Sequence, residues 1–305
     1  MMKTPLVSVV VVSYNQSQYI EENLESIKNQ TYSNIELIVS DDASTDNSVE
    51  TFETWLKEND YSAKKNFHQL NTGLATVLNE CIAMATGKYI KLIAADDFLH
   101  PEYVEKCVQK LEELKDEYGM VFTHTYTIDE NGNTIKDIAD YDILGNIDPY
   151  IFRKELLKSN RIAALTVLMK AKVLRETGEY DSRFIIEDYY RWLKINEKYL
   201  IAYIPERLAY YRIHPQNISK VKAKKIEMET LQLQMMFDKE GVVKDRINRC
   251  TRQYYFVEKK LPLEYINAYQ QYPFHTKKLY FAIKNKFPVL FYKFLSHIQE
   301  MSKIG

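Results

Sequence analysis

The chain has 305 residues, of which 46% are hydrophobic and 27% charged, and its formal net charge is −1. These values indicate a soluble globular protein with a large core, and the near-zero charge gives no reason to expect a nucleic-acid partner. Its three cysteines have the spacing of neither a disulfide framework nor a zinc site. No apolar run reaches about 18 residues and no signal-peptide pattern is present, so we expect a cytoplasmic protein.

Buried strands and helical patterns alternate over the first part of the chain. We predict strands at 6–12, 35–39, 66–70 and 89–94, and helices at 16–30, after the polar loop at 40–46, at 73–85 and at 101–114. This alternation predicts an α/β fold with a doubly wound, mostly parallel sheet. Ligands of such sheets bind beyond the carboxyl ends of the strands, where polar residues at 13–15, 41–42 and 96–97 follow.

The second half of the chain is less regular. We predict a β-hairpin from 120–128 and 134–138 around an Asn-Gly turn, strands at 165–169 and 201–204, and a helix at 187–199 with an acidic first turn. From about residue 219 the chain becomes highly charged and helical in pattern. We therefore expect a catalytic domain at 1–218 and a helical C-terminal region at 219–305.

Several common site types are excluded by their motifs. The eight glycines cannot form G-x-G-x-x-G or a P-loop, and neither G-x-S-x-G nor H-E-x-x-H occurs. Two acid pairs remain, Asp96-Asp97 after an apolar run and Glu187-Asp188 at a helix start. Carboxylates are costly beside apolar runs unless a cation or a proton-transfer task holds them there. Helix capping and the helix dipole are the structural alternatives for these pairs.

In these residues the chain resembles the family 2 glycosyltransferases of the bacterial surface-polysaccharide type, which have the GT-A fold. The resemblance covers roughly residues 6 to 219. Its blocks are 7–15 (VSVVVVSYN), 38–48 (IVSDDASTDNS), 71–79 (NTGLATVLN), 87–97 (GKYIKLIAADD), 187–192 (EDYYRW) and 211–214 (YRIH) with Ser219.

The resemblance implies an inverting, metal-assisted transfer of one sugar from a nucleotide-diphosphate sugar, most simply a UDP-sugar, to a hydroxyl of a saccharide acceptor. It assigns nucleotide-sugar binding to Ser13, Tyr14, Asn15, Asp42, Asn71, Gly73, Asn79 and Asp97. Asp42 is expected to accept a hydrogen bond from the uracil N3–H. Mn²⁺ or Mg²⁺ is the expected cofactor, with Asp96 and His214 as its ligands.

A general base must take the proton of the acceptor hydroxyl, and we assign this role to Asp188, with Glu187 as the second candidate. Trp192 either lines the acceptor site or belongs to the hydrophobic core. The chain departs from the family pattern at Ala94, where an acid is usual, and at Leu78, where arginine is frequent. Because an acid is missing at Ala94, a degenerate, non-catalytic sugar-nucleotide-binding protein is an alternative function. A processive polysaccharide synthase is a further alternative, although Asp188 stands where its Q-x-x-R-W motif would have glutamine.

Residues 274–305 combine lysines with aromatic side chains. This pattern is typical of an interfacial helix on anionic lipid, and equally of a helix that packs on the catalytic domain or forms a homodimer. Membrane contact would suit a polyprenyl-linked saccharide acceptor at the inner face of the plasma membrane, in O-antigen, capsule or other surface-polysaccharide synthesis.

Overall fold

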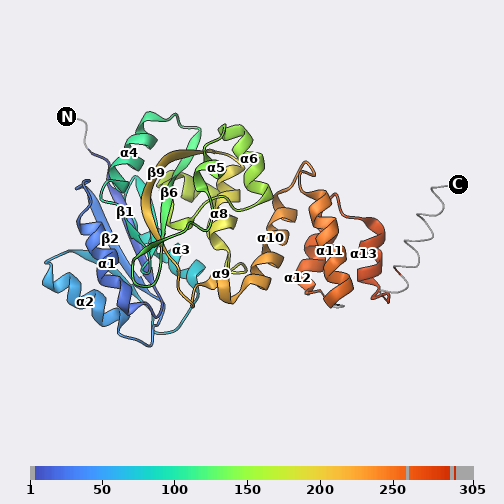
Figure 1. Cartoon of the computed structure of the whole chain (residues 1–305), viewed down its shortest axis with the longest axis horizontal. Helices are drawn as coiled ribbons and strands as arrows, with labels where there is room; N and C mark the ends of the chain where they lie inside the picture. The colour runs from blue at the N-terminus through green and yellow to red at the C-terminus, as the bar shows by residue number, and fades with distance from the viewer. Residues whose placement is uncertain (1–3, 259–260, 289–291, 293–305) are drawn as a thin grey trace. The chain divides into compact units, whose positions relative to one another are not determined.

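A computed structural model of the chain describes residues 4–258, 261–288 and 292. Their contacts form two compact units, residues 1–156 with 160–221, and residues 157–159 with 222–305. Figure 1 shows that the first unit contains the sheet and that the second is made of helices. The predicted α/β class and the C-terminal helices are therefore confirmed.

One curved sheet runs through the first unit. Its order is β3-β2-β1-β4-β8-β6-β9-β5, with β7 paired to β6. The parallel part contains β1 (Val7–Ser13), β2 (Ile35–Asp41), β3 (Ala63–Phe67) and β4 (Tyr89–Ala94). Beyond it lie β8 (Val167–Lys170), antiparallel to both neighbours, β6 (Tyr118–Ile128), the long β9 (Leu200–Arg212), β5 (Phe98–Leu99) and β7 (Thr134–Ile135).

Helices cover this sheet because its central strands are apolar on both faces, as the continuous burial of β1 shows. Val9 and Val11 of β1 share one buried cluster with Ile20 of α1 and Phe52 of α2. The helices of this unit are α1 (Ser17–Lys28), α2 (Ser48–Glu58), α3 (Leu74–Met84), α4 (Tyr103–Glu113), α5 (Tyr141–Gly145), α6 (Pro149–Lys158), α7 (Ala171–Thr177), α8 (Glu187–Asn196) and α9 (Ile218–Val221).

The structure differs from the sequence predictions in three places. The strand expected at 66–70 is β3 at Ala63–Phe67, a half-exposed edge strand that carries two lysines and therefore lacks an apolar run. The strand expected at 201–204 continues to Arg212, because β9 pairs with β6 through several irregular steps in register. The helices α5, α6 and α7 lie in a segment without a clear hydrophobic pattern, for which no helix was predicted.

The second unit contains α10 (Ala223–Phe237), α11 (Lys244–Glu258), α12 (Leu263–Gln271) and α13 (Lys277–Lys284). Buried Asp238, directly after α10, connects the ends of these helices. It accepts hydrogen bonds from the backbone N–H groups of Val242 (2.8 Å) and Val243 (3.0 Å), which precede α11, and from the hydroxyl of Tyr272 (2.6 Å), which follows α12. Within the described part of the chain, no helix has the length and apolar character needed to cross a membrane.

Candidate active site

The polar clusters expected at one edge of the sheet do meet there. Ser13 and Asp41, the last residues of β1 and β2, are paired in register, and Val12 is paired with Ala94 at the end of β4. Because β2, β1 and β4 are adjacent and parallel, the loops that follow them open on the same edge. This edge holds most of the residues assigned to the nucleotide sugar and the metal.

The loops after β1 and β2 are bonded to each other. The Asn15 side chain accepts a hydrogen bond from the Thr45 N–H (2.8 Å), and the Asn15 N–H donates to the Ser44 hydroxyl (2.8 Å). Asn15 adopts a left-handed backbone with φ of 54°, which asparagine tolerates better than most residues. Ser13 is buried below this junction, whereas Tyr14 is 50% exposed above it. The exposed tyrosine is thus available to a ligand.

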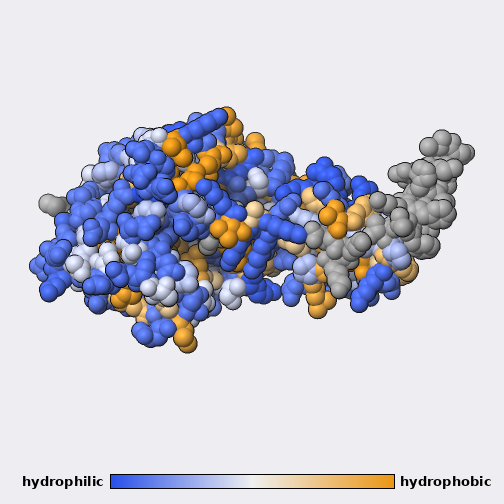
Figure 2. Space-filling model, turned by 60° about the horizontal axis from the view of Figure 1, so that its bottom comes forward, coloured by the Kyte–Doolittle hydropathy of each residue, from blue (hydrophilic) through white to orange (hydrophobic). Residues whose placement is uncertain are grey.

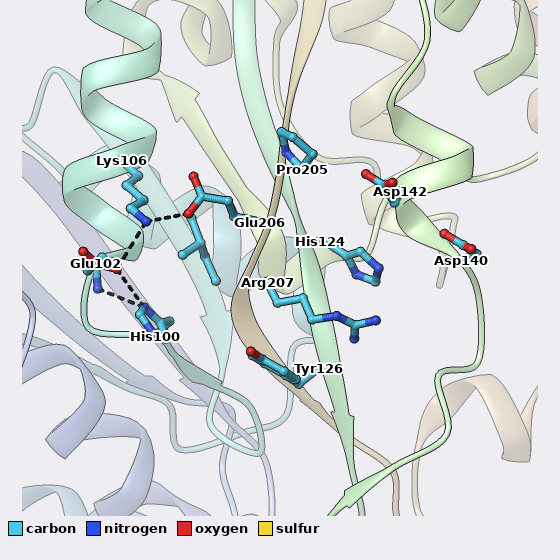
Figure 3. Close-up of a pocket in the computed structure, with 11 residues that line it drawn as sticks. His100, Glu102, Lys106, His124, Tyr126, Asp140, Asp142, Pro205, Glu206 and Arg207 are labelled. Atoms are coloured by element: carbon cyan, nitrogen blue, oxygen red, sulfur yellow. Dashed lines mark hydrogen bonds and ion pairs between the residues drawn. The ribbon is translucent and has the colours of Figure 1, made fainter.

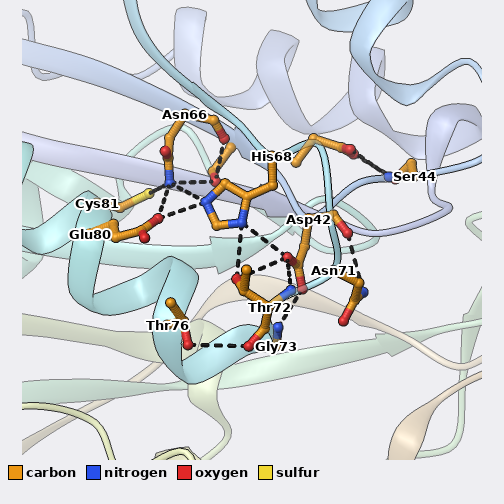
Figure 4. A network of polar contacts seen from close by, with 12 residues as sticks. Asp42, Ser44, Asn66, His68, Asn71, Thr72, Gly73, Thr76, Glu80 and Cys81 are labelled. Carbon is orange, nitrogen blue, oxygen red and sulfur yellow. Dashed lines mark hydrogen bonds and ion pairs between the residues drawn. The ribbon is translucent and has the colours of Figure 1, made fainter.

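Asp42 is the centre of a second set of contacts, at the start of α3 (Figure 4). Its carboxylate accepts hydrogen bonds from the N–H groups of Thr72 and Gly73, both at 2.8 Å. Gly73 has φ of 87°, a conformation that glycine adopts without strain, and this turn directs both N–H groups at the acid. The Asn71 amide donates to the Asp42 carbonyl (3.2 Å). Asp42, Asn71 and Gly73 are therefore brought together.

Asn79 has contacts of another kind. Its side-chain amide donates to the Tyr180 carbonyl (3.0 Å) and accepts from the Tyr180 N–H (2.8 Å). Both ends of the amide thus hold the segment that precedes α8. The assignment of Asn79 to the nucleotide sugar stays a prediction, and the structure adds a scaffolding role.

The two proposed metal ligands lie against each other. The His214 Nε2 atom is 2.9 Å from the Asp96 Oδ2 atom, and both side chains are buried. The hydrogen bond to Asp96 raises the pKa of His214 above its ordinary value. On the other side of the ring, Nδ1 lies 3.0 Å from the Gln216 side-chain oxygen, which orients the imidazole. Residues 118 positions apart in the chain thus form one pair of donor atoms.

Asp97 and Arg212 complete this cluster. Burial, and then the neighbouring charge of Asp96, raise the pKa of Asp97 well above its usual range. The Arg212 N–H donates to the Asp97 carboxylate (2.9 Å), and the Arg212 guanidinium donates to the Asp96 carbonyl (2.8 Å) and pairs with Glu22. Arg212 was part of a quoted motif but received no role from the sequence. Its backbone and side chain fix the positions of both acids.

This donor set fits a divalent cation that is shared with a phosphate ligand. No group of three or more His, Cys, Asp or Glu side chains suited to a metal is found among the described residues. Mg²⁺ and Mn²⁺ in nucleotide sites use one or two protein ligands and take the rest from phosphates and water. The oxygen of Asp96 and the nitrogen of His214 meet that smaller requirement.

Glu187 and Asp188 form the first turn of α8. The Asp188 carboxylate accepts hydrogen bonds from the Asn160 amide (3.1 Å) and from the Tyr189 N–H (2.6 Å). Burial raises the pKa of Asp188 above its ordinary value, and the two hydrogen bonds oppose this rise. Trp192, on the same helix, is only 2% exposed and belongs to the core.

The pKa of Tyr141 responds to one acid of each pair. Burial raises the pKa of Tyr141, and the charges of Tyr211, Asp188, Asp137 and Asp97 raise it further. Asp97, from the strand edge, and Asp188, from α8, thus lie within electrostatic range of the same hydroxyl.

A cavity of about 650 Å³ lies elsewhere (Figure 3). None of the site residues predicted from the sequence lines it, and Lys106 there pairs with Glu206 (2.5 Å) and Glu102 (3.2 Å). A smaller cavity of about 340 Å³ is lined by Tyr19, Glu22 and Arg212, among others, and so adjoins the Asp96 cluster. The cluster of Asp96, Asp97 and Arg212 therefore lies beside this smaller cavity and away from the residues that line the other one.

Comparison with known proteins decides the family. The model of glycosyl transferase family 2 matches residues 8–176. The chain belongs to this family. It is 33% identical over 243 residues to an uncharacterized glycosyltransferase of Haemophilus influenzae, which covers 74% of this chain and 73% of that protein. The resemblance drawn from the motifs is confirmed, and the chain is a glycosyltransferase.

Solved structures of similar fold carry nucleotide sugars. One is S. aureus TarS 1–349 in complex with UDP-GlcNAc, with a TM-score of 0.62 and 17% identity over 92% of this chain and 88% of that chain. Another is the mannosyltransferase PcManGT from Pyrobaculum calidifontis with GDP-Man and Mn²⁺, with a TM-score of 0.60 and 17% identity over 100% of this chain and 82% of that chain. At these identities the likeness establishes the shared fold.

Proposed function

We propose that this glycosyltransferase transfers one sugar, with inversion, from a UDP-sugar to a hydroxyl of a saccharide acceptor. The contact between Asp96 and His214 carries the proposal, because these two side chains, which would hold a cation, lie together at the strand edge that also holds Asp42. Asp97 beside this pair is assigned to the donor sugar or ribose.

The chemistry requires one base and no nucleophile of the protein. The acceptor oxygen forms a bond to the anomeric carbon from the face opposite the diphosphate, and the bond from that carbon to the phosphate oxygen breaks. The acceptor proton passes to the carboxylate of Asp188, and UDP leaves with the electron pair. Asp188 suits this task because burial raises its pKa and so strengthens it as a base.

A divalent cation, Mn²⁺ or Mg²⁺, would stabilise the negative charge on the leaving diphosphate. Asp96 and His214 would hold it, and the His214 ring would be kept in place by Gln216. PcManGT, a protein of similar fold, was solved with Mn²⁺. The absence of an acid at Ala94 leaves Asp96 as the principal carboxylate for this role.

The first experiment measures UDP release from a panel of UDP-sugars, with and without Mn²⁺, for the wild type, Asp96→Asn and Asp188→Asn. We expect metal-dependent release with one donor. We expect Asp188→Asn to lower kcat about 10²- to 10⁴-fold, the usual contribution of a general base. Asp116→Asn, at an exposed acid distant in sequence from the site, is the matched control.

Release that neither substitution affects would refute the residue assignments. A protein that binds UDP-sugars and returns them intact, with or without an acceptor, would be the non-catalytic binder that Ala94 keeps open. Release of long chains of product without dissociation would instead indicate the processive synthase.

The acceptor is proposed to be a saccharide on a polyprenyl carrier, within surface-polysaccharide synthesis, with the enzyme at the inner face of the plasma membrane. The described part of residues 274–305 supports this: Lys277 and Lys284 of α13 are exposed, and Phe281 between them is 57% exposed. Residues 289–291 and 293–305 of this predicted lipid-binding segment lie outside the described residues. Dimerisation through the same segment remains the alternative proposal.

A further inference from the structure

His68, which received no role from the sequence, lies between two carboxylates (Figure 4). Its Nδ1 atom is 3.1 Å from Asp42 Oδ1, and its Nε2 atom is 2.6 Å from Glu80 Oε2. The side chain is 11% exposed, whereas that of Glu80 is 47% exposed. Nδ1 also lies 2.9 Å from the Thr72 hydroxyl. The imidazole is thus held at both nitrogens. Nδ1 is directed at Asp42, the acid that is assigned to the nucleobase of the donor.

The two oxygens of Asp42 are used unequally. Among the described residues, Oδ1 contacts the Thr72 N–H (2.8 Å), the Thr72 hydroxyl (3.2 Å) and His68 Nδ1 (3.1 Å). Oδ2 accepts only the Gly73 N–H, at 2.8 Å. A carboxylate offers about four lone-pair sites, two on each oxygen. In the tautomer with a proton on Nδ1, His68 and Thr72 fill the lone pairs of Oδ1, and Oδ2 keeps one site for a further donor.

We propose that His68 is a specificity-determining residue of the nucleotide site. By occupying Oδ1 together with Thr72, it leaves Asp42 with a single acceptor position and so selects a base that presents a single imide N–H. The inference rests on the proposed function, in which Asp42 meets the base of the donor. His68 acts through Asp42, so it is a positioning residue.

Uracil, guanine and cytosine differ in the number of hydrogen-bond donors that they present to Asp42. Uracil presents one N3–H between two carbonyl oxygens, which matches one free lone pair. Guanine presents two adjacent donors, N1–H and the N2 amino group, which pair best with both oxygens of a carboxylate. Cytosine has an unprotonated N3, so its acceptor would face the acid without a hydrogen. A buried acceptor left without a donor costs about 1–3 kcal/mol, which disfavours cytosine.

The test is isothermal titration of UDP, CDP and GDP into the full chain. The variants are His68→Leu, which removes the donor to Oδ1, and His68→Asn, whose amide nitrogen can take the place of Nδ1 but cannot reach Glu80. His100→Leu is the matched control, since His100 lines the separate 650 Å³ cavity. Thermal melting of each variant monitors the fold. Thr72→Val, which removes the other side-chain contact to Oδ1, replaces His68→Leu if that variant does not fold.

We expect the wild type and His100→Leu to bind UDP at least about tenfold more tightly than CDP or GDP. His68→Leu should lose about tenfold in UDP affinity and narrow the preference over GDP, and His68→Asn should restore much of that preference. An unchanged UDP-to-GDP ratio in His68→Leu, or an equal loss for all three nucleotides, would overturn the inference and leave the proposed function intact. A wild type without preference for UDP would overturn both.

Discussion

At Asp188, the candidate general base, the hydrogen bond from Asn160 and the burial of the side chain have opposite effects on the pKa. Burial favours the neutral form of Asp188 and raises its pKa, whereas the Asn160 amide stabilises the charged form. A carboxyl with a raised pKa in the folded protein stabilises the fold when protonated, and this stabilisation is lost as the pH rises through the folded pKa. Asp188→Asn, which mimics the neutral form, should therefore be at least as thermally stable as the wild type at neutral pH.

Removing the Asn160 amide should make Asp188 harder to ionise. In Asn160→Ala we expect the acid limb of the kcat/KM profile to move to higher pH, because the base must be unprotonated and its pKa rises further. The profile is measured by UDP release between pH 5 and 9. Asn29→Ala, at the exposed C-terminal end of α1, is the control and should leave the limb in place. A uniform fall in rate with no change in the limb would contradict a role for Asn160 in setting the pKa.

At the scale of elements, α3 connects the two halves of the site. Its N-terminus is held by Asp42 through Thr72 and Gly73, and Asn79 in its middle holds the segment before α8. The sequence block 71–79, which includes Asn71, Gly73 and Asn79, thus forms one scaffold. Because α3 is held at both points, it fixes the position of the sheet edge that holds Asp42 relative to the segment before α8, the helix of Asp188.

Asn79→Ala removes both hydrogen bonds to Tyr180 and leaves two backbone groups without their partner. We expect a loss of about 1–3 kcal/mol in the free energy of unfolding, measured by urea titration. Thr76→Ala, which removes only a local bond to the Thr72 carbonyl on the same helix, should cost less. Equal stability of Asn79→Ala and the wild type would show that the two hydrogen bonds contribute nothing to stability. Binding of the nucleotide sugar would then be the only role proposed for Asn79.

For the whole molecule, the second unit has its own buried polar contacts, several of them made by tyrosine hydroxyls. Tyr265, for example, is bonded to Thr251 (2.7 Å) inside it. On the face shown in Figure 2, hydrophobic side chains lie among hydrophilic ones over these helices. The exposed lysines and Phe281 of α13 are the described part of the proposed lipid contact.

If α13 meets anionic lipid, the full chain should sediment with vesicles of phosphatidylglycerol and not with phosphatidylcholine alone. Lys277→Gln, Lys284→Gln and Lys286→Gln together should weaken this binding by roughly 100-fold, at about 1 kcal/mol for each lysine. The control changes three exposed lysines of the first unit, at 57, 115 and 198, to glutamine. Binding that persists equally in both triple variants, or is absent from the wild type, would contradict the lipid contact and leave packing on the catalytic domain or homodimerisation as the role of this segment.

The sequence by itself determined the fold class and the succession of the first strands along the chain, because continuous β-branched runs and helical spacing are local signals. Its motifs determined the family. It also placed Asp42, Asp96 and Asp188 at the ends of elements. It did not find β3 as an edge strand, the extent of β9, or helices α5 to α7. The length of β9 depends on its pairing with β6, which lies far from it in the chain.

Only the tertiary structure decided which atoms meet. The pairing of Asp96 with His214, the hold of Arg212 on Asp97, and the position of His68 between Asp42 and Glu80 join residues far apart in the chain. A pattern along the chain shows that a polar residue ends a strand, but the number of hydrogen bonds its oxygens accept depends on the loops that fold over it. The same holds for the pKa of Asp188, which is raised by burial, a property of the assembled fold.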